Sequence, residues 1–152
     1  MKKIVVEARL CTGCRLCEAV CAAWHEDALC VAAARIRVFR RERAGRAVAV
    51  TCTQCQESPC ARVCPVAAIR RSPSSGALVL DPAACIGCEL CVAACPIGAV
   101  FSANGKVVKC DLCGGEPKCV QFCSAGALRH VAPLDVAAER STALAQAALE
   151  GL

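Results

Sequence analysis

Sixteen of the 17 cysteines in this 152-residue chain fall into four groups of four, and this repeat constrains the fold more than any other feature. Every quartet opens with the spacing C-x2-C and closes with C-x3-C, so the quartets form an internal repeat. The four quartets are Cys11, Cys14, Cys17 and Cys21; Cys52, Cys55, Cys60 and Cys64; Cys85, Cys88, Cys91 and Cys95; and Cys110, Cys113, Cys119 and Cys123.

The spacing within a quartet suits iron–sulfur chemistry. Three closely spaced cysteines lie on one loop that can wrap one face of a cubane, with backbone N–H groups directed at its sulfurs. The fourth cysteine comes where the chain has turned away, and in bacterial two-cluster ferredoxins such a cysteine binds the other cluster. A proline after it, as at Pro65 and Pro96, suits a chain that enters a helical turn. The pattern predicts four [4Fe–4S] clusters.

Disulfides and zinc sites are two other uses of closely spaced cysteines. A disulfide scaffold is typical of small secreted chains, but the start, MKKIVVEARLC, lacks the apolar region of a signal peptide. Zinc knuckles also use C-x2-C pairs, but they need neither a third cysteine in each loop nor the C-x3-C-P ending. Several zinc ions without acid-labile sulfide would contradict the cluster interpretation.

The composition agrees with a core built around clusters. Aromatic residues make up 3% of the chain, so a conventional core would be thin. The formal net charge of +5 counts every cysteine as neutral, whereas sixteen thiolates around four oxidised cores would bring the total to about −3. The surplus of Lys and Arg then offsets cluster charge. It does not predict a nucleic-acid partner, because no aromatic stacking platform accompanies it.

Short strands and turns are predicted between the quartets. Alternating patterns and turn signals place strands at 35–40 and 47–50, joined through 42–46, at 77–80, and on both sides of Asn104-Gly105. Short helical turns are expected after the last cysteine of each quartet. Residues 134–149 have apolar residues at helical spacing and predict a helix.

With these motifs, the sequence resembles the four-cluster ferredoxin-like electron-transfer subunits of multi-subunit oxidoreductases. Relatives in that family serve molybdenum and tungsten enzymes, hydrogenases and carbon monoxide dehydrogenase. The resemblance covers about residues 1–131, and all sixteen ligand positions are cysteine here. It implies an electron-transfer subunit with four cubanes.

The resemblance also implies that the first quartet pairs with the fourth and the second with the third. The implied ligand sets are Cys11, Cys14, Cys17 and Cys123; Cys110, Cys113, Cys119 and Cys21; Cys52, Cys55, Cys60 and Cys95; and Cys85, Cys88, Cys91 and Cys64. In agreement, the two inner quartets alone end in Cys-Pro. Two tandem ferredoxins, pairing first with second and third with fourth, are the alternative.

The expected fold class is therefore α+β, with two interleaved bacterial-ferredoxin-like halves, short β-hairpins and short helices around four cubane clusters. An inner ferredoxin, about 50–100, is inserted in an outer one formed by 1–49 and 101–131. Together these make a four-cluster domain over 1–131. Residues 132–152 form a helical C-terminal tail.

No acid/base pair, nucleophile motif, phosphate loop or G-x-G-x-x-G fingerprint indicates an organic substrate site. We therefore expect a non-catalytic subunit that relays single electrons between a catalytic oxidoreductase subunit and another partner, such as a flavin- or NAD-linked subunit or a ferredoxin. The chain looks most similar to the small subunits of tungsten aldehyde oxidoreductases. The alternatives are a subunit of a formate dehydrogenase, hydrogenase or carbon monoxide dehydrogenase, or a free diffusible polyferredoxin.

The expected location is the cytoplasm, without a membrane span, because no apolar run approaches the ~20 residues that a span requires. A domain with four clusters and two ends also allows copies to stack end to end.

Four further features have two interpretations each. The stretch 35–46 holds six arginines and is either a solvated hairpin that balances cluster charge or a docking arm for an acidic partner. The C-terminal tail either packs on its own domain or binds a partner or a neighbouring copy. Cys30, outside the quartets, is expected to be a small buried hydrophobe rather than a ligand. His25 either has a structural role or tunes the cluster of the first quartet, which it follows.

Overall fold

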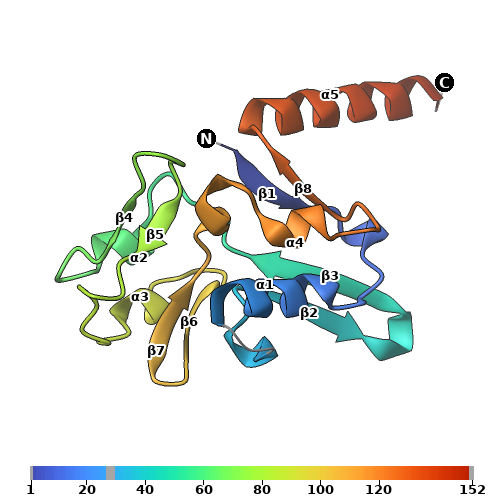
Figure 1. Ribbon diagram of the computed structural model, residues 1–152. Helices are drawn as coiled ribbons and strands as arrows, with labels where there is room; N and C mark the ends of the chain where they lie inside the picture. Colours follow the sequence, from blue (N-terminus) through green and yellow to red (C-terminus); the bar gives the residue numbers. More distant parts are fainter. Residues whose placement is uncertain (1, 27–29, 151–152) are drawn as a thin grey trace.

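The computed structural model describes residues 2–26 and 30–150. Residues 1, 27–29 and 151–152, which belong to the predicted domain and tail, lie outside the described residues. The described chain combines four two-stranded antiparallel sheets with short helices (Figure 1). The predicted mixture of helix and strand is therefore confirmed.

The first and last strands of the chain pair with each other. Strand β1 (Lys3–Val6) runs antiparallel to β8 (Leu128–Val131), with Ile4 opposite His130. Ile4 and Leu128 point into the core and are 6% and 4% exposed. This sheet brings the two ends of the cysteine-rich region together, as Figure 1 shows.

The other three sheets are hairpins, and they confirm the predicted strands, while β4 was not predicted. They are β2 (Ile36–Arg41) with β3 (Arg46–Thr51), β4 (Ile69–Arg71) with β5 (Leu78–Leu80), and β6 (Val100–Ala103) with β7 (Lys106–Lys109). The turn between β6 and β7 has positive φ at both Asn104 and Gly105, 51° and 72°, as a type I′ turn requires.

The short helices lie before the last cysteine of a quartet, so their predicted position after it is wrong for three quartets. Helices α2 (Pro59–Arg62), α3 (Leu90–Ala93) and α4 (Lys118–Gln121) each contain the third cysteine. The physical reason is the C-x3-C spacing, because residues four apart share one face of a helical turn. Only α1 (Leu16–Glu26) continues past its last cysteine.

The four cysteine-bearing helices pack in two pairs. Helix α1 lies against α4, and α2 lies against α3. In Figure 1, α2 and α3 lie on the left with the β4–β5 hairpin, while α1 and α4 lie toward the right with the β1–β8 sheet and the β2–β3 hairpin. Helices of the first and fourth quartets are thus neighbours, as are those of the second and third.

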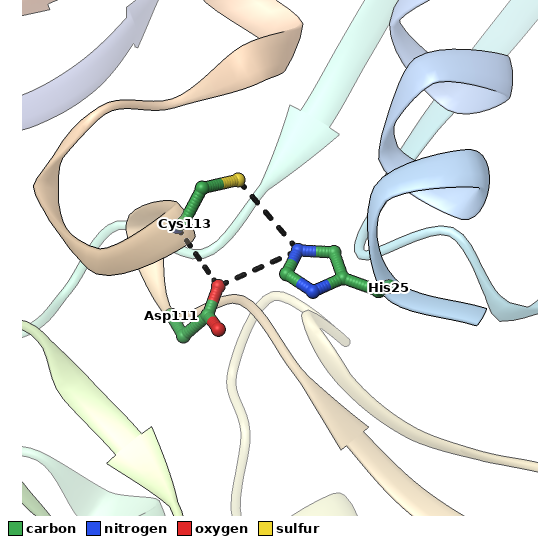
Figure 2. Close-up of side chains that lie close together, drawn as sticks. All are labelled: His25, Asp111 and Cys113. Carbon is green, nitrogen blue, oxygen red and sulfur yellow. Dashed lines mark hydrogen bonds and ion pairs between the residues drawn. The ribbon is translucent and has the colours of Figure 1, made fainter. Parts of the chain in front are cut away.

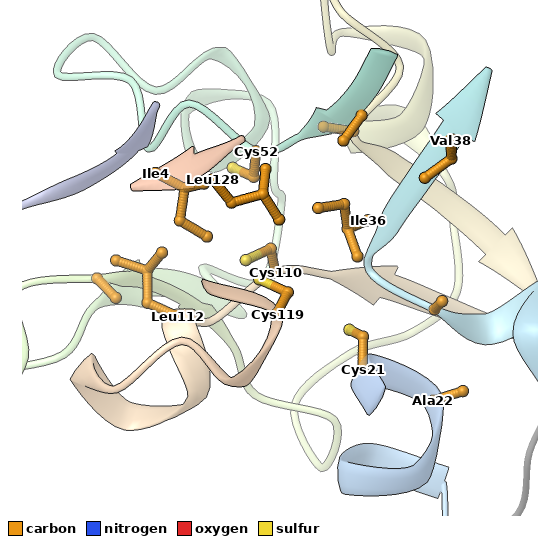
Figure 3. Close-up of a cluster of buried hydrophobic side chains, with 14 of the residues drawn as sticks. Ile4, Cys21, Ala22, Ile36, Val38, Cys52, Cys110, Leu112, Cys119 and Leu128 are labelled. Carbon is orange, nitrogen blue, oxygen red and sulfur yellow. The ribbon is translucent and has the colours of Figure 1, made fainter. Parts of the chain in front are cut away.

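The core contains few large side chains and many cysteines. The larger of two buried clusters joins Ile36 and Leu112, each 1% exposed, to apolar residues from both ends of the chain (Figure 3). Its buried cysteines are Cys21, Cys52, Cys110 and Cys119. The smaller cluster lies within residues 60–107 and contains Cys60 and Cys91. Thiols thus occupy positions that aliphatic side chains fill in an ordinary core.

The predicted C-terminal helix is present as α5 (Pro133–Glu150), which projects from the body in Figure 1. Leu134 and Leu144 are 82% and 74% exposed, so the domain does not cover these two apolar side chains. An ion pair of 2.7 Å joins Arg129 of β8 to Glu139 of α5. No helix in the described part of the chain has both the length and the apolarity needed to cross a bilayer.

Candidate iron–sulfur centres

One small cavity collects three cysteines of the first quartet and one of the fourth. Cys11, Cys14, Cys17 and Cys123 all line it, although Cys123 lies at the far end of the cysteine-rich region. Val38 of β2 forms part of its apolar wall. Four thiols that converge on an apolar space fit a cubane, each of whose irons takes one thiolate. This is one of the four sets implied by the family resemblance.

A second small cavity has the same composition within the inner quartets. Its lining includes Cys52, Cys55 and Cys60 of the second quartet and Cys95 of the third. Leu78 of β5 completes an apolar wall. The structure therefore brings together a second implied set, again with three thiols from one quartet and one from another.

In the other two sets, the thiols interact through their charges. Burial raises the pKa of Cys119 well above its usual range, and Cys110, Cys21 and Cys113 raise it further. The remaining set has Cys91 near its centre, where burial and then Cys60, Cys64 and Cys85 raise its pKa. Cys88, the last member of that set, is exposed.

The loops share one backbone feature across all four quartets. The residue before the second cysteine has a left-handed conformation in each, with φ of 71° at Gly13, 53° at Gln54, 69° at Gly87 and 59° at Leu112. This conformation costs roughly 1–2 kcal/mol for a residue with a Cβ. The backbone conformation at this position therefore repeats in all four loops, although the residue type does not, because two of these residues are not glycine.

Backbone N–H groups reach the sulfur of the last cysteine in three quartets. Arg35, Ala68 and Ala99 donate to the Sγ atoms of Cys21, Cys64 and Cys95, each at 3.2 Å. Such hydrogen bonds stabilise thiolate ligands and influence cluster potential. Such donors were expected around the three-cysteine loops, where the N–H of Gln54 donates to Cys52 Sγ at 3.5 Å. The three at the closing cysteines are additional to that expectation.

Burial holds several of these thiols in the protonated form when no metal is bound. It raises the pKa of Cys17 and Cys21 to about 11 and that of Cys110 to about 12. Metal ligation requires the thiolate, so binding of a cluster releases these protons.

His25 lies beside the fourth quartet, which argues against the alternative in which it tunes the cluster of the first quartet. Its Nε2 atom is 3.6 Å from the Sγ of Cys113 and 3.6 Å from Asp111 (Figure 2). The reason is the length of α1, which places His25 one turn beyond Cys21, and Cys21 lies near Cys113. Burial, and then the charge of Arg35, lower the pKa of His25, which favours the neutral imidazole.

Cys30 lies outside all four sets. It is half-buried rather than fully buried as expected, and Asn104 Nδ2 approaches its Sγ at 3.9 Å.

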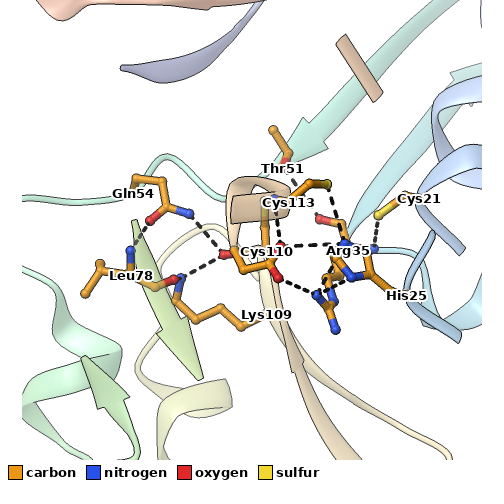
Figure 4. A network of polar contacts seen from close by, with 10 residues as sticks. Cys21, His25, Arg35, Thr51, Gln54, Leu78, Lys109, Cys110 and Cys113 are labelled. Carbon is orange, nitrogen blue, oxygen red and sulfur yellow. Dashed lines mark hydrogen bonds and ion pairs between the residues drawn. The ribbon is translucent and has the colours of Figure 1, made fainter. Parts of the chain in front are cut away.

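Two buried polar residues that the sequence analysis missed join the second and fourth quartets (Figure 4). Gln54 is fully buried and donates to the carbonyl of Cys110 at 3.0 Å, while it accepts from the N–H of Leu78 at 2.8 Å. Lys109 is 3% exposed and donates to Leu78 O at 2.6 Å and Cys110 O at 3.1 Å. The sequence signal for Lys109 was a charged residue placed between the apolar pair Val107-Val108 and the predicted ligand Cys110.

Comparison with known proteins identifies 4Fe–4S domains in this chain. A 4Fe–4S dicluster domain model matches residues 44–132, and a 4Fe–4S binding domain model matches residues 9–24. The polyferredoxin-like subunit of the aliphatic sulfonate oxidoreductase of Pyrococcus furiosus is 43% identical over 122 residues, which cover 79% of this chain and 70% of that protein. The putative electron transport protein YsaA of Escherichia coli K12 is 42% identical, with 83% and 87% covered.

A solved structure shows the same fold. A chain of the active site complex BamBC of benzoyl coenzyme A reductase, in complex with zinc, is 26% identical to this chain. The match covers 95% of this chain and 90% of that one, with a TM-score of 0.52.

Proposed function

Because the chain belongs to the 4Fe–4S dicluster domain family and binds [4Fe–4S] clusters, we propose that it relays single electrons through four of them as a non-catalytic subunit of an oxidoreductase complex. Bound clusters supply the one-electron chemistry. The chain's own residues hold the irons, exclude water and set the charge around each site.

The proposed ligand sets are the four implied by the family resemblance. The packing of α1 against α4 and of α2 against α3 supports them, because these helices carry cysteines of the paired quartets. The two cavities that each collect three thiols from one quartet and one from its partner are the observation that carries this proposal. The same pairing supports an inner ferredoxin at about 50–100 nested within an outer one, in a domain over 1–131 with a tail at 132–152.

The proposed partner is a catalytic subunit of the tungsten aldehyde oxidoreductase type, with the other redox partner a flavin- or NAD-linked subunit or a ferredoxin, in the cytoplasm. The similarity to a subunit of a sulfonate oxidoreductase complex supports a dedicated partner of this general kind. The exposed apolar residues of α5 leave a further contact for a partner or a second copy.

Metal analysis of the native complex tests the function. The chain is purified without oxygen through a tag, and iron, sulfide, tungsten, molybdenum and nickel are measured together. About sixteen irons and as many sulfides per chain are expected, with tungsten in a co-eluting subunit. Zinc without sulfide would overturn the cluster proposal. Iron in a chain that elutes alone would overturn the dedicated-subunit proposal and indicate a diffusible polyferredoxin.

Replacement of Cys21 by serine tests the pairing of quartets. The proposed pairing predicts that the cluster built on Cys110 is lost or altered while the cluster built on Cys52 is retained. The opposite result would favour tandem pairing. Electron paramagnetic resonance of the reduced protein, compared with a Cys30→Ser control, distinguishes the two outcomes.

A further inference from the structure

Lys109 is a charged side chain enclosed at the junction of the two halves. It ends β7, immediately before the first ligand of the fourth quartet, and is 3% exposed. Its Nζ atom has three neighbours within hydrogen-bonding range, and all three are acceptors: Leu78 O at 2.6 Å, Cys110 O at 3.1 Å and Cys52 Sγ at 3.6 Å. A lysine ammonium has three donors and no acceptor, so this environment matches the cation.

The counter-charge of Lys109 is a thiolate. No Asp or Glu forms an ion pair with this lysine among the residues that the structure describes. A buried charge is costly unless it is paired, and the neighbouring group that can pair with it is the thiolate of Cys52. Its charge also acts on the neighbouring thiol Cys60, whose pKa it lowers against the larger, opposite effect of burial. Cys52 and Cys60 belong to the same proposed ligand set.

The position of Lys109 lies between two proposed clusters. Its two shortest contacts are with the carbonyl oxygens of Leu78 and Cys110 (Figure 4). The N–H of Leu78 also donates to the side chain of Gln54. These hydrogen bonds hold the Nζ of Lys109 next to the Sγ of Cys52. Together with those of Gln54, they connect the second quartet to the fourth. The thiols of Cys52 and Cys110 are close enough for their charges to interact.

We propose that Lys109 is a positioning residue for electron transfer, whose buried positive charge raises the reduction potential of the cluster held through Cys52. This rests on the proposed function, in which that thiol binds a cluster. Reduction adds one negative charge to a cluster, and a nearby cation stabilises the reduced form more than the oxidised form. Burial strengthens the effect, because solvent screens a buried pair less than an exposed one.

The test is a potentiometric titration of the holo-protein, monitored by electron paramagnetic resonance, for Lys109→Met. Methionine keeps the length of the side chain and removes its charge. We expect one midpoint potential to move to a lower value, by more than the other three move. Lys106→Met is the matched control, because Lys106 lies on the same strand but is exposed, and its midpoints should equal those of the wild type.

A second variant separates charge from hydrogen bonding. Lys109→Gln keeps a donor but no charge, and it should lower the same midpoint. The midpoint that Lys109→Met lowers should be missing or altered in Cys52→Ser, which assigns it to the cluster held through Cys52. Unchanged midpoints in Lys109→Met with full iron content would overturn the inference while leaving the proposed function intact. Absence of iron and sulfide from the wild type would instead overturn the proposed function.

A measurement on the wild-type chain tests the inference even if the variants fail to bind iron. Lysine isotopically labelled at Nζ is incorporated, and hyperfine coupling of that nitrogen to the reduced clusters is recorded. Coupling from a lysine in contact with a ligand sulfur is expected. Its absence from every cluster would also overturn the inference.

Discussion

The loops of the first and third quartets have the same cysteine spacing and the same backbone, yet they present different surfaces. Both expose their second cysteine, Cys14 and Cys88. Both are left-handed before it, at Gly13 and Gly87, and again after it, where Arg15 and Glu89 have φ of 61° and 58°. The shared cysteine spacing therefore goes with a shared loop backbone, while the side chains between the cysteines differ.

The surroundings of the two loops differ at Gly13 and Gly87, because the β2–β3 hairpin packs closely against the first of these glycines. Glu18 of α1 is buried and accepts from the N–H of Val38 at 2.7 Å, which ties the first loop to β2. A Cβ added at Gly13 would lie 2.8 Å from the Cβ of Ala47 on β3. At Gly87, the corresponding Cβ would meet nothing within 4 Å.

The two loops also differ in charge and polarity. The covering hairpin places Arg40 beside the first loop, with its Nε 3.0 Å from where a Cβ of Gly13 would lie, and Arg41 and Arg43 continue toward the hairpin tip. The third loop instead exposes Ile86 and Leu90, at 64% and 51%. A basic end suits an acidic, exchangeable electron carrier. An apolar end suits a subunit that stays bound.

The largest expected difference comes from adding one methyl group to each loop. Gly13→Ala should destabilise the holo-protein by about 2–4 kcal/mol, because it combines left-handed strain with overpacking against Ala47. Gly87→Ala has the strain alone and should cost roughly 1–2 kcal/mol. Iron released to a chelator during guanidinium unfolding measures both. Equal losses would show that the hairpin does not confine the first loop.

The sequence could predict local features of the molecule but not contacts between distant segments. The quartets, the hairpins and the Asn104-Gly105 turn follow from residues close together in the chain, so they were predictable. Lys109 and Gln54 were not, because each acts on a quartet or strand far from it in the sequence. The neighbour of His25 was not predictable for the same reason, since the approach of α1 toward Cys113 is a tertiary feature.

An intermediate effect is expected from the basic end. Changing Arg40, Arg41 and Arg43 together to serine should slow electron transfer from the reduced protein to tris(oxalato)cobaltate(III), a trianion, by about tenfold at low salt. The difference should shrink as salt screens the charges. Stopped-flow absorbance measures the rate, and hexaamminecobalt(III), a trication, is the control, whose rate should not fall. Equal slowing with both oxidants would mean that the clusters, not the surface charges, had changed.

The smallest effect is expected at the apolar end, because only two side chains are involved. Changing Ile86 and Leu90 to serine should weaken binding of the co-purifying catalytic subunit by roughly threefold, with little dependence on salt, since apolar contacts carry no charge. Leu16→Ser is the matched control, because Leu16 occupies the position in the first loop that Leu90 occupies in the third and is 41% exposed. Subunit recovered with the tagged chain, at several salt concentrations, measures binding. If Leu16→Ser releases the subunit and the double variant does not, the two ends have exchanged roles, and the covered loop faces the permanent partner.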